Sequence, residues 1–201
     1  MLEFGVVSHL SAAVVYGLLA GFTASRYLRR NTDRAVLLAS LLTTLWALIV
    51  VAQNLWGWPT FTVRYLTELA RNGAWILVLF ALIRDAREGA VISRRMVIFT
   101  AGAFSMILAL LVIAALVGRV SGGSFLSARA ALFGQLAIAL LGISVLEQIW
   151  RNASTYGRSS IRYICFGVGG IFIFEFILYA DALLFDRISE GLWDARGAIN
   201  V

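Results

Sequence analysis

Residues 35–58 read AVLLASLLTTLWALIVVAQNLWGW and contain no charged side chain. Because a helix needs about 20 mainly apolar residues to cross a bilayer, this stretch predicts a transmembrane helix. The whole chain shares this character, since 61% of its 201 residues are hydrophobic and 14% are charged. Soluble domains have about 45–50% and 25%, and a chain of this size cannot hide so much apolar surface from water. A water-soluble globular protein is therefore excluded.

Five more stretches have the length and composition of a membrane span. With the first, the six predicted spans are residues 4–25, 35–58, 65–83, 97–118, 125–149 and 161–185. None of them shows the alternating pattern that is typical of a membrane β-strand. We therefore predict an all-α, polytopic transmembrane helical bundle that forms a single membrane domain over residues 1–201.

The arginines predict how the bundle is oriented. Eleven arginines lie in the first, third and fifth connections, and four lie in the alternate connections and after the last span. The larger group is Arg26, Arg29, Arg30, Arg34, Arg84, Arg87, Arg94, Arg95, Arg151, Arg158 and Arg162, and the smaller is Arg64, Arg119, Arg187 and Arg196. By the positive-inside rule the arginine-rich connections are cytoplasmic, so the N-terminus and the residues after 185 lie outside. Residues 197–201 look like the start of another apolar run, so we expect the protein to continue.

The scarcity of reactive residues excludes several kinds of chemistry. The chain has no lysine, one histidine (His9) and one cysteine (Cys165). A lysine Schiff base, an HExxH zinc site, a disulfide and a cysteine metal cluster are all impossible with these residues. The predicted topology puts His9 and Cys165 at opposite faces of the bilayer, which argues against a membrane cysteine enzyme and makes Cys165 a small core residue. We therefore predict no catalytic residue, no metal and no cofactor in this chain.

Polar residues within the predicted spans mark a candidate site, because ionisable groups are costly at membrane depth. Glu68, Arg71 and Asn72 share one helix face by their spacing, as do Glu175 and Tyr179. The candidate ligand-binding residues are Glu68, Arg71, Asn72, Arg129, Glu175, Tyr179, Asp181 and His9. They lie in the outer halves of their helices under the predicted topology.

Two interpretations of these residues stay open. They could form buried ion pairs that fix the register of the helices. Alternatively, they could line an outward-facing pocket in which Arg71 and Arg129 hold the anionic groups of a ligand. Taken singly, Asp181 and His9 are more typical of residues at the membrane interface.

Several short stretches resemble one family. They are residues 1–9 (MLEFGVVSH), 72–75 (NGAW), 146–152 (LEQIWRN), 161–165 (IRYIC), 178–185 (LYADALLF) and 192–197 (LWDARG). Together they resemble the N-terminal membrane region of the PrsK-type sensor histidine kinases of the PEP-CTERM/exosortase system. The resemblance covers essentially the whole chain, and its last two stretches are the most specific.

The resemblance implies a signal-input module of a two-component system, in the inner membrane of a bacterium, that responds to an envelope or exopolysaccharide-related signal. A cytoplasmic kinase portion beyond these residues would use ATP and phosphorylate a response regulator. We expect membrane lipid as a further partner, a homodimer, and no nucleic acid. The chain holds none of the kinase motifs, so it is not itself expected to be an enzyme. The alternative is a small transporter or channel, which is disfavoured because the inner halves of the spans are apolar and contain no proline.

Overall fold

The computed structural model describes residues 2–25, 31–58, 61–86, 98–107, 124–152 and 155–200. All regular secondary structure in these residues is helical, which confirms the all-α prediction. The helices are α1 (Leu2–Ser25), α2 (Asn31–Trp56), α3 (Phe61–Ala86), α5 (Ser124–Asn152), α6 (Thr155–Phe185) and α7 (Glu190–Ile199), with a further segment at Ile98–Ile107.

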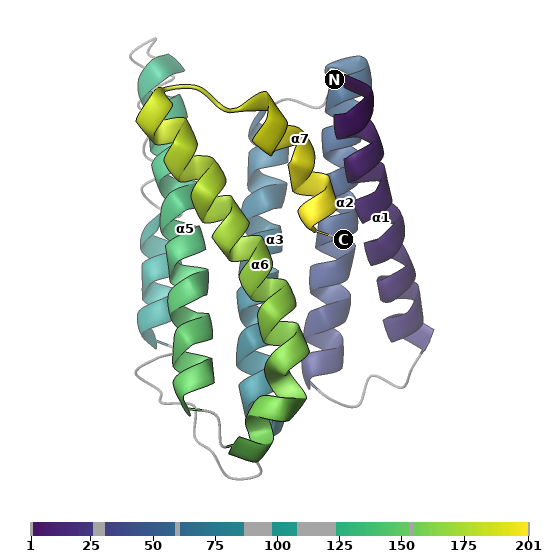
Figure 1. The fold of residues 1–201 in the computed structure, drawn as a ribbon, viewed down its shortest axis with the longest axis vertical. Helices are drawn as coiled ribbons and strands as arrows, with labels where there is room; N and C mark the ends of the chain where they lie inside the picture. Colours follow the sequence, from purple (N-terminus) through teal and green to yellow (C-terminus); the bar gives the residue numbers. More distant parts are fainter. Residues whose placement is uncertain are drawn as a thin grey trace.

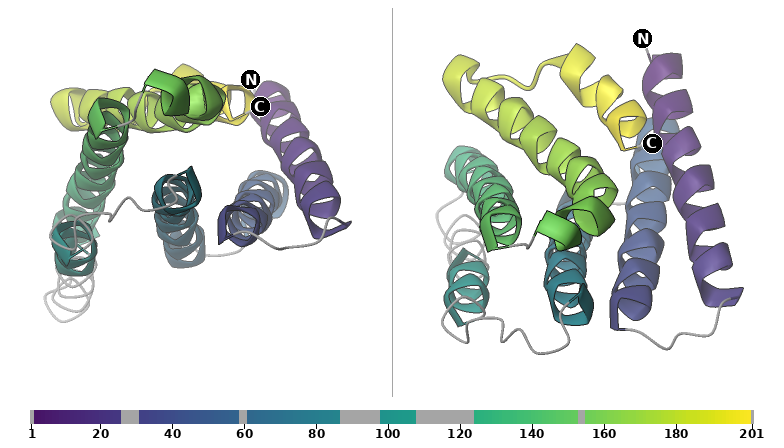
Figure 2. Two further views of the ribbon diagram at one scale, coloured as in Figure 1. Left: turned by 90° about the horizontal axis from the view of Figure 1, so that it is seen from below. Right: turned by 60° about the horizontal axis from the view of Figure 1, so that its bottom comes forward.

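The long helices stand side by side and alternate in direction (Figure 1). The C-terminal ends of α1, α3 and α5 and the N-terminal ends of α2 and α6 lie together at the bottom of that view. Helix α6 crosses in front of α3 in Figure 1, and the view from below shows α1 and α2 to one side of α3 and α5 to the other (Figure 2). The helices on either side of each arginine-rich connection therefore meet at one end of the bundle.

Four helices are long and apolar enough to cross a membrane. They are Phe4–Ser25, Asn31–Trp56, Arg129–Arg151 and Arg162–Phe185. Helix α3 has 26 residues but also Arg64, Glu68 and Arg71, and it is not among the four. Of the predicted span 97–118, residues 98–107 form an apolar helix and residues 108–118 lie outside the described residues. Four candidate spans are thus established, and the count of six stays a prediction.

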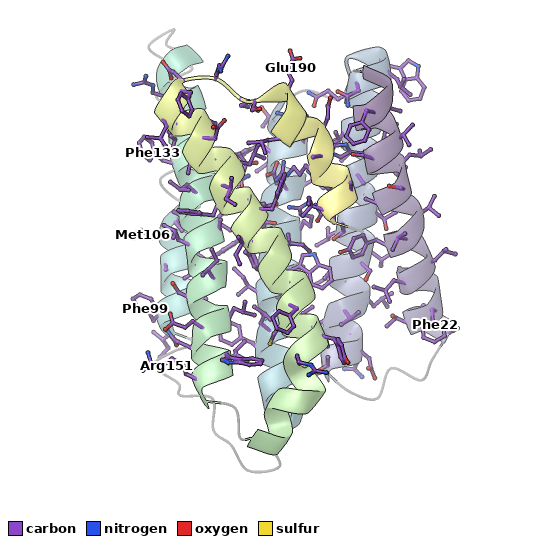
Figure 3. All side chains as sticks on the ribbon, in the orientation of Figure 1. Phe22, Phe99, Met106, Phe133, Arg151 and Glu190 are labelled. Carbon is purple, nitrogen blue, oxygen red and sulfur yellow. The ribbon has the colours of Figure 1, made fainter. Side chains whose placement is uncertain are left out.

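Large apolar side chains cover the outside of the bundle. Phe22, Phe99, Met106 and Phe133 are exposed and point away from the helices (Figure 3). A soluble monomer rarely exposes apolar surface so widely, because water penalises it. This surface is suited to contact with lipid chains.

The largest apolar cluster is built mainly by α3, α5 and α6, with contributions from α1 and α2. Leu79, Phe172 and Cys165 are buried in it, so Cys165 is a core residue as predicted. A Cβ atom at Gly142 of α5 would lie 2.6 Å from the Phe172 ring. Glycine at this position therefore lets α6 pack closely against α5.

The last described residues form a short helix that turns back along the bundle. Helix α6 ends at Phe185, and Asp186 has a positive φ of 53° that breaks its direction. Helix α7 then packs beside α1 and α6 (Figure 1). The sequence placed Arg196 with Arg187 after the last predicted span, and the structure adds that α7 carries Arg196 into the interior of the bundle, with 0% exposure.

Candidate functional site

Four charged side chains meet inside the bundle, and we call them the ionic network: Glu68 and Arg71 of α3, Glu175 of α6 and Arg196 of α7. None of the four residues is more than 2% exposed. Nη2 of Arg71 donates to Oε1 of Glu175, and Nη2 of Arg196 donates to Oε1 of Glu68 and, at 2.8 Å, to Oε1 of Glu175. Glu175 therefore bridges two arginines. The two positive and two negative charges balance, which burial requires.

Neutral side chains add further hydrogen bonds to the carboxylates. Nδ2 of Asn72 donates to Oε2 of Glu175 at 2.7 Å, and Oδ1 of Asn72 accepts from Nη2 of Arg71 at 3.0 Å. The hydroxyl of Tyr179 donates to Oε1 of Glu68. These bonds stabilise the charged forms and tie α3 to α6, since buried polar groups are stable only when they have partners.

Aromatic rings surround the two guanidinium groups. Cζ of Arg71 lies 4.0 Å from the centre of the Trp46 ring on α2, and Cζ of Arg196 lies 4.9 Å from the same ring. Arg196 also lies 5.2 Å from the Trp193 ring and 5.5 Å from the Tyr179 ring. Stacking of cations on aromatic faces is favourable and strengthens when water is excluded. Trp46 therefore links α2 to the ionic network.

His9 of α1 lies beside this arrangement. It is fully buried, and the centre of its ring is 5.3 Å from that of Trp46. Its Nδ1 is 2.8 Å from the carbonyl oxygen of Gly5. Because a carbonyl only accepts, Nδ1 carries a proton in this bond. His9 thus contacts the aromatic wall of the network rather than its charges.

Close backbone contacts hold α7 against α1. A Cβ atom at Gly197 would overlap Ser8 and the backbone of His9, and one at Gly5 would overlap the Asp194 side chain. The hydroxyl of Ser8 donates to the carbonyl oxygen of Asp194 at 2.5 Å. Glycine at these two positions is what lets the helices approach closely enough for Arg196 to reach the carboxylates.

The structure brings together most of the residues predicted from the sequence. Glu68, Arg71, Asn72, Glu175 and Tyr179 are joined by hydrogen bonds, and His9 lies next to them.

The two other candidates lie elsewhere. Arg129 pairs with Asp186 at 2.8 Å near the surface, with side-chain exposures of 48% and 55%. Asp181 is partly exposed, and no hydrogen bond or ion pair joins it to the other candidates within the described residues. The spacing of Glu68, Arg71 and Asn72 correctly put them on one face of α3. It could not show whether Arg129 on α5 points toward that face.

Four residues of the site were missing from the predicted set: Trp46, Gln135, Arg196 and Asn200. Oε1 of Gln135 accepts from Asn72 at 3.5 Å, and Oδ1 of Asn200 accepts from Arg71 at 3.5 Å. Gln135 could have been found, because it is a polar residue in an apolar stretch. Arg196 and Asn200 could not, since their place depends on α7 folding back along α1.

Comparison with known proteins does not identify the function of this site. The chain matches no model of a protein family, no curated protein and no solved structure. Within the described residues there is no group of three or more His, Cys, Asp or Glu side chains that could hold a metal ion. The arrangement is instead a charge-balanced contact between α3, α6 and α7, and any change to one charge disturbs the other three.

Proposed function

We propose that the chain is the membrane signal-input module of a bacterial two-component sensor histidine kinase, of the PrsK type in the PEP-CTERM/exosortase system. In this proposal the bundle has six spans in the inner membrane with the N-terminus outside. A cytoplasmic kinase portion beyond these residues uses ATP and phosphorylates a response regulator, and the protein acts as a homodimer. The resemblance of the sequence suggests this class.

The observation that carries the proposal is the ionic network. Glu175 contacts arginines from two other helices, so it cannot keep both contacts if those helices move apart. A set of buried charges of this kind has few stable arrangements, because each unpaired charge is costly in a dry interior. Such an element can convert a local event into a change of helix packing when a signal favours one arrangement over another.

The position of the network also suits an input site. Glu68 and Arg71 are in the first half of α3, and Glu175 and Tyr179 are in the second half of α6. Because neighbouring helices run in opposite directions, these positions fall in the half of the bundle that holds the start of α1 (Figure 1). Under the proposed topology this half faces the cell exterior, where an envelope signal arises.

Two measurements test the proposal: the sequence of the complete reading frame and the phosphorylation activity of the full-length protein. We expect the complete reading frame to encode a kinase core after these residues. In nanodiscs, we expect the Tyr179→Phe variant of the full-length protein to change autophosphorylation from ATP, since it removes one donor to Glu68 while keeping the ring. The matched control is Tyr163→Phe, because Tyr163 is exposed on the same helix. A reading frame without a kinase core would refute the proposal, as would a Tyr179→Phe protein with unchanged phosphorylation.

A further inference from the structure

The guanidinium group of Arg196 is surrounded in the way that a bound ligand usually is. Its guanidinium group lies between two carboxylates and among three aromatic rings. Apart from Trp193, the surrounding groups belong to the long helices: Trp46 to α2, Glu68 to α3, and Glu175 and Tyr179 to α6. We call these four residues the cation cage. Carboxylates combined with aromatic faces are the usual means by which proteins recognise organic cations.

The two arginines of the network differ in how fully they are satisfied. Nε, Nη1 and Nη2 of Arg71 all donate hydrogen bonds. Only Nη2 of Arg196 does so, while its buried Nε and Nη1 have no hydrogen-bond partner within the described residues. Buried N–H groups without acceptors cost free energy. Arg196 therefore fits the cage less well than Arg71 fits its own surroundings.

The helix that carries Arg196 is also the one that can leave most easily. Helix α7 has ten residues, whereas α3, which carries Arg71, has 26. Its N-cap residue, Ser189, makes no side-chain capping bond. A short helix gains little stability from its own backbone, so α7 depends on contacts with α1 and with the cage. Opening of α7 would leave the long helices of the bundle in place.

Charge balance decides which ligand the cage can accept. A cation that replaces Arg196 leaves the buried network neutral. An anion added to the four paired charges leaves a net negative charge in an apolar interior, which is strongly disfavoured. The structure therefore favours a cationic ligand over the anionic ligand considered from the sequence. The carboxylates of Glu68 and Glu175 both accept from N–H groups, so the ligand must carry such donors.

We propose that Trp46, Glu68, Glu175 and Tyr179 form a binding site for an organic cation with a guanidinium or primary ammonium group, and that Arg196 is its internal, displaceable occupant. Binding of the cation releases α7 from the bundle. This deepens the proposed function, because release of α7 would be the first step of the signal. The binding site itself does not depend on kinase activity.

The experiment measures the position of α7 in the full-length protein in lipid nanodiscs. Spin labels are placed at Glu190→Cys on α7 and Leu55→Cys on α2, in a Cys165→Ser background. Both labelled positions are exposed, and Glu190 points away from the bundle (Figure 3). Distances are recorded by pulsed electron paramagnetic resonance with millimolar methylguanidinium, with tetramethylammonium at equal ionic strength as the control. Tetramethylammonium has the charge but no N–H donor.

We expect methylguanidinium, and not tetramethylammonium, to add a second population with a different distance. Arg196→Ala should show that population without any added cation. Methylguanidinium should also raise the thermal stability of Arg196→Ala. The concentration needed should be about tenfold lower than the one that moves α7 in the unsubstituted protein, because there Arg196 competes for the same site and lowers the apparent affinity. Arg129→Ala, which removes an exposed arginine, should behave like the unsubstituted protein.

Two results would overturn the proposal. One is a distance distribution that methylguanidinium leaves unchanged in the unsubstituted protein, which can be read even if Arg196→Ala does not fold. The other is an equal response to tetramethylammonium, which would indicate a general effect of cations. Both readouts are independent of phosphorylation. A moving α7 in a protein without kinase activity would therefore refute the proposed function and keep the cation site.

Discussion

The ionic network and the Arg129–Asp186 pair join the same kinds of groups in opposite surroundings. The distance from Nη2 of Arg196 to Oε1 of Glu175 is 2.8 Å, and the distance from Nη2 of Arg129 to Oδ2 of Asp186 is also 2.8 Å. The first pair has side-chain exposures of 0% and 1%, and the second has 48% and 55%. The two ion pairs therefore have the same N–O distance and differ in how deeply they are buried.

Distance alone does not indicate how much an ion pair contributes to stability. At the surface, water solvates either partner when the other leaves, so such a pair contributes about 0–1 kcal/mol. In the interior a lone charge has no such solvation, so removal of one partner costs about 3–5 kcal/mol. The buried pairs thus make the contact between α3, α6 and α7 depend on each charge keeping a partner, whereas the surface pair imposes no such condition.

The largest effect is expected for Glu175→Gln. The substitution leaves Arg71 without a carboxylate and gives the buried network a net positive charge, so we expect a loss of about 3–5 kcal/mol in unfolding free energy. Unfolding in bicelles by steric trapping measures it. Glu147→Gln is the matched control, because Glu147 is 65% exposed in its pair with Arg151. A Glu175→Gln loss as small as that of the control would mean that the network is solvated.

An intermediate effect is expected for Gly197→Ala, which tests whether α7 must pack closely for Arg196 to be buried. The new Cβ would overlap Ser8 and the backbone of His9, and backbone cannot move aside cheaply. Overpacking of this kind costs about 1–3 kcal/mol, and here it should push α7 outward. Gly191→Ala on the same helix is the control, since a Cβ there meets nothing within 4 Å. The rate of trypsin cleavage after Arg196 should rise for Gly197→Ala only. Equal rates would contradict the close packing of α7.

The smallest effect is expected for Arg129→Ala. We expect a change of about 0–1 kcal/mol in unfolding free energy, which high salt reduces further because the pair is exposed. The measurement is the same unfolding experiment at low and high salt. A loss comparable with that of Glu175→Gln would show that exposure does not separate the two regions.

The sequence predicted the helices and one face of the site. Charge-free stretches of sufficient length identify helices with few alternatives, and the spacing of Glu68, Arg71 and Asn72 put them on one face of α3. The same spacing rule joined Glu175 to Tyr179. These predictions succeeded because they depend only on the geometry of a single helix.

The remaining parts of the site depend on how each helix is rotated about its axis and on how α7 folds back along the bundle. The spacing of residues within one helix carries no information about either. Arg129 looked equivalent to Arg71 because both lie early in an apolar stretch, yet it faces the surface beside Asp186. Trp46 looked like any aromatic residue of a span, and its role follows from the two guanidinium groups stacked on it. The burial of Arg196 was missed because nothing in its local sequence shows that Gly5 and Gly197 let α7 pack against α1.

A double-mutant cycle between Arg196 and Glu68 measures how strongly the two side chains are coupled inside the bundle. The unfolding free energies of the unsubstituted protein, Arg196→Met, Glu68→Gln and the double variant are compared in bicelles. The double variant removes one charge of each sign and keeps the interior neutral, so it should be more stable than the two single losses predict, by about 2–3 kcal/mol. Losses that add within about 0.5 kcal/mol would contradict the claim that α7 carries Arg196 into a buried contact with Glu68.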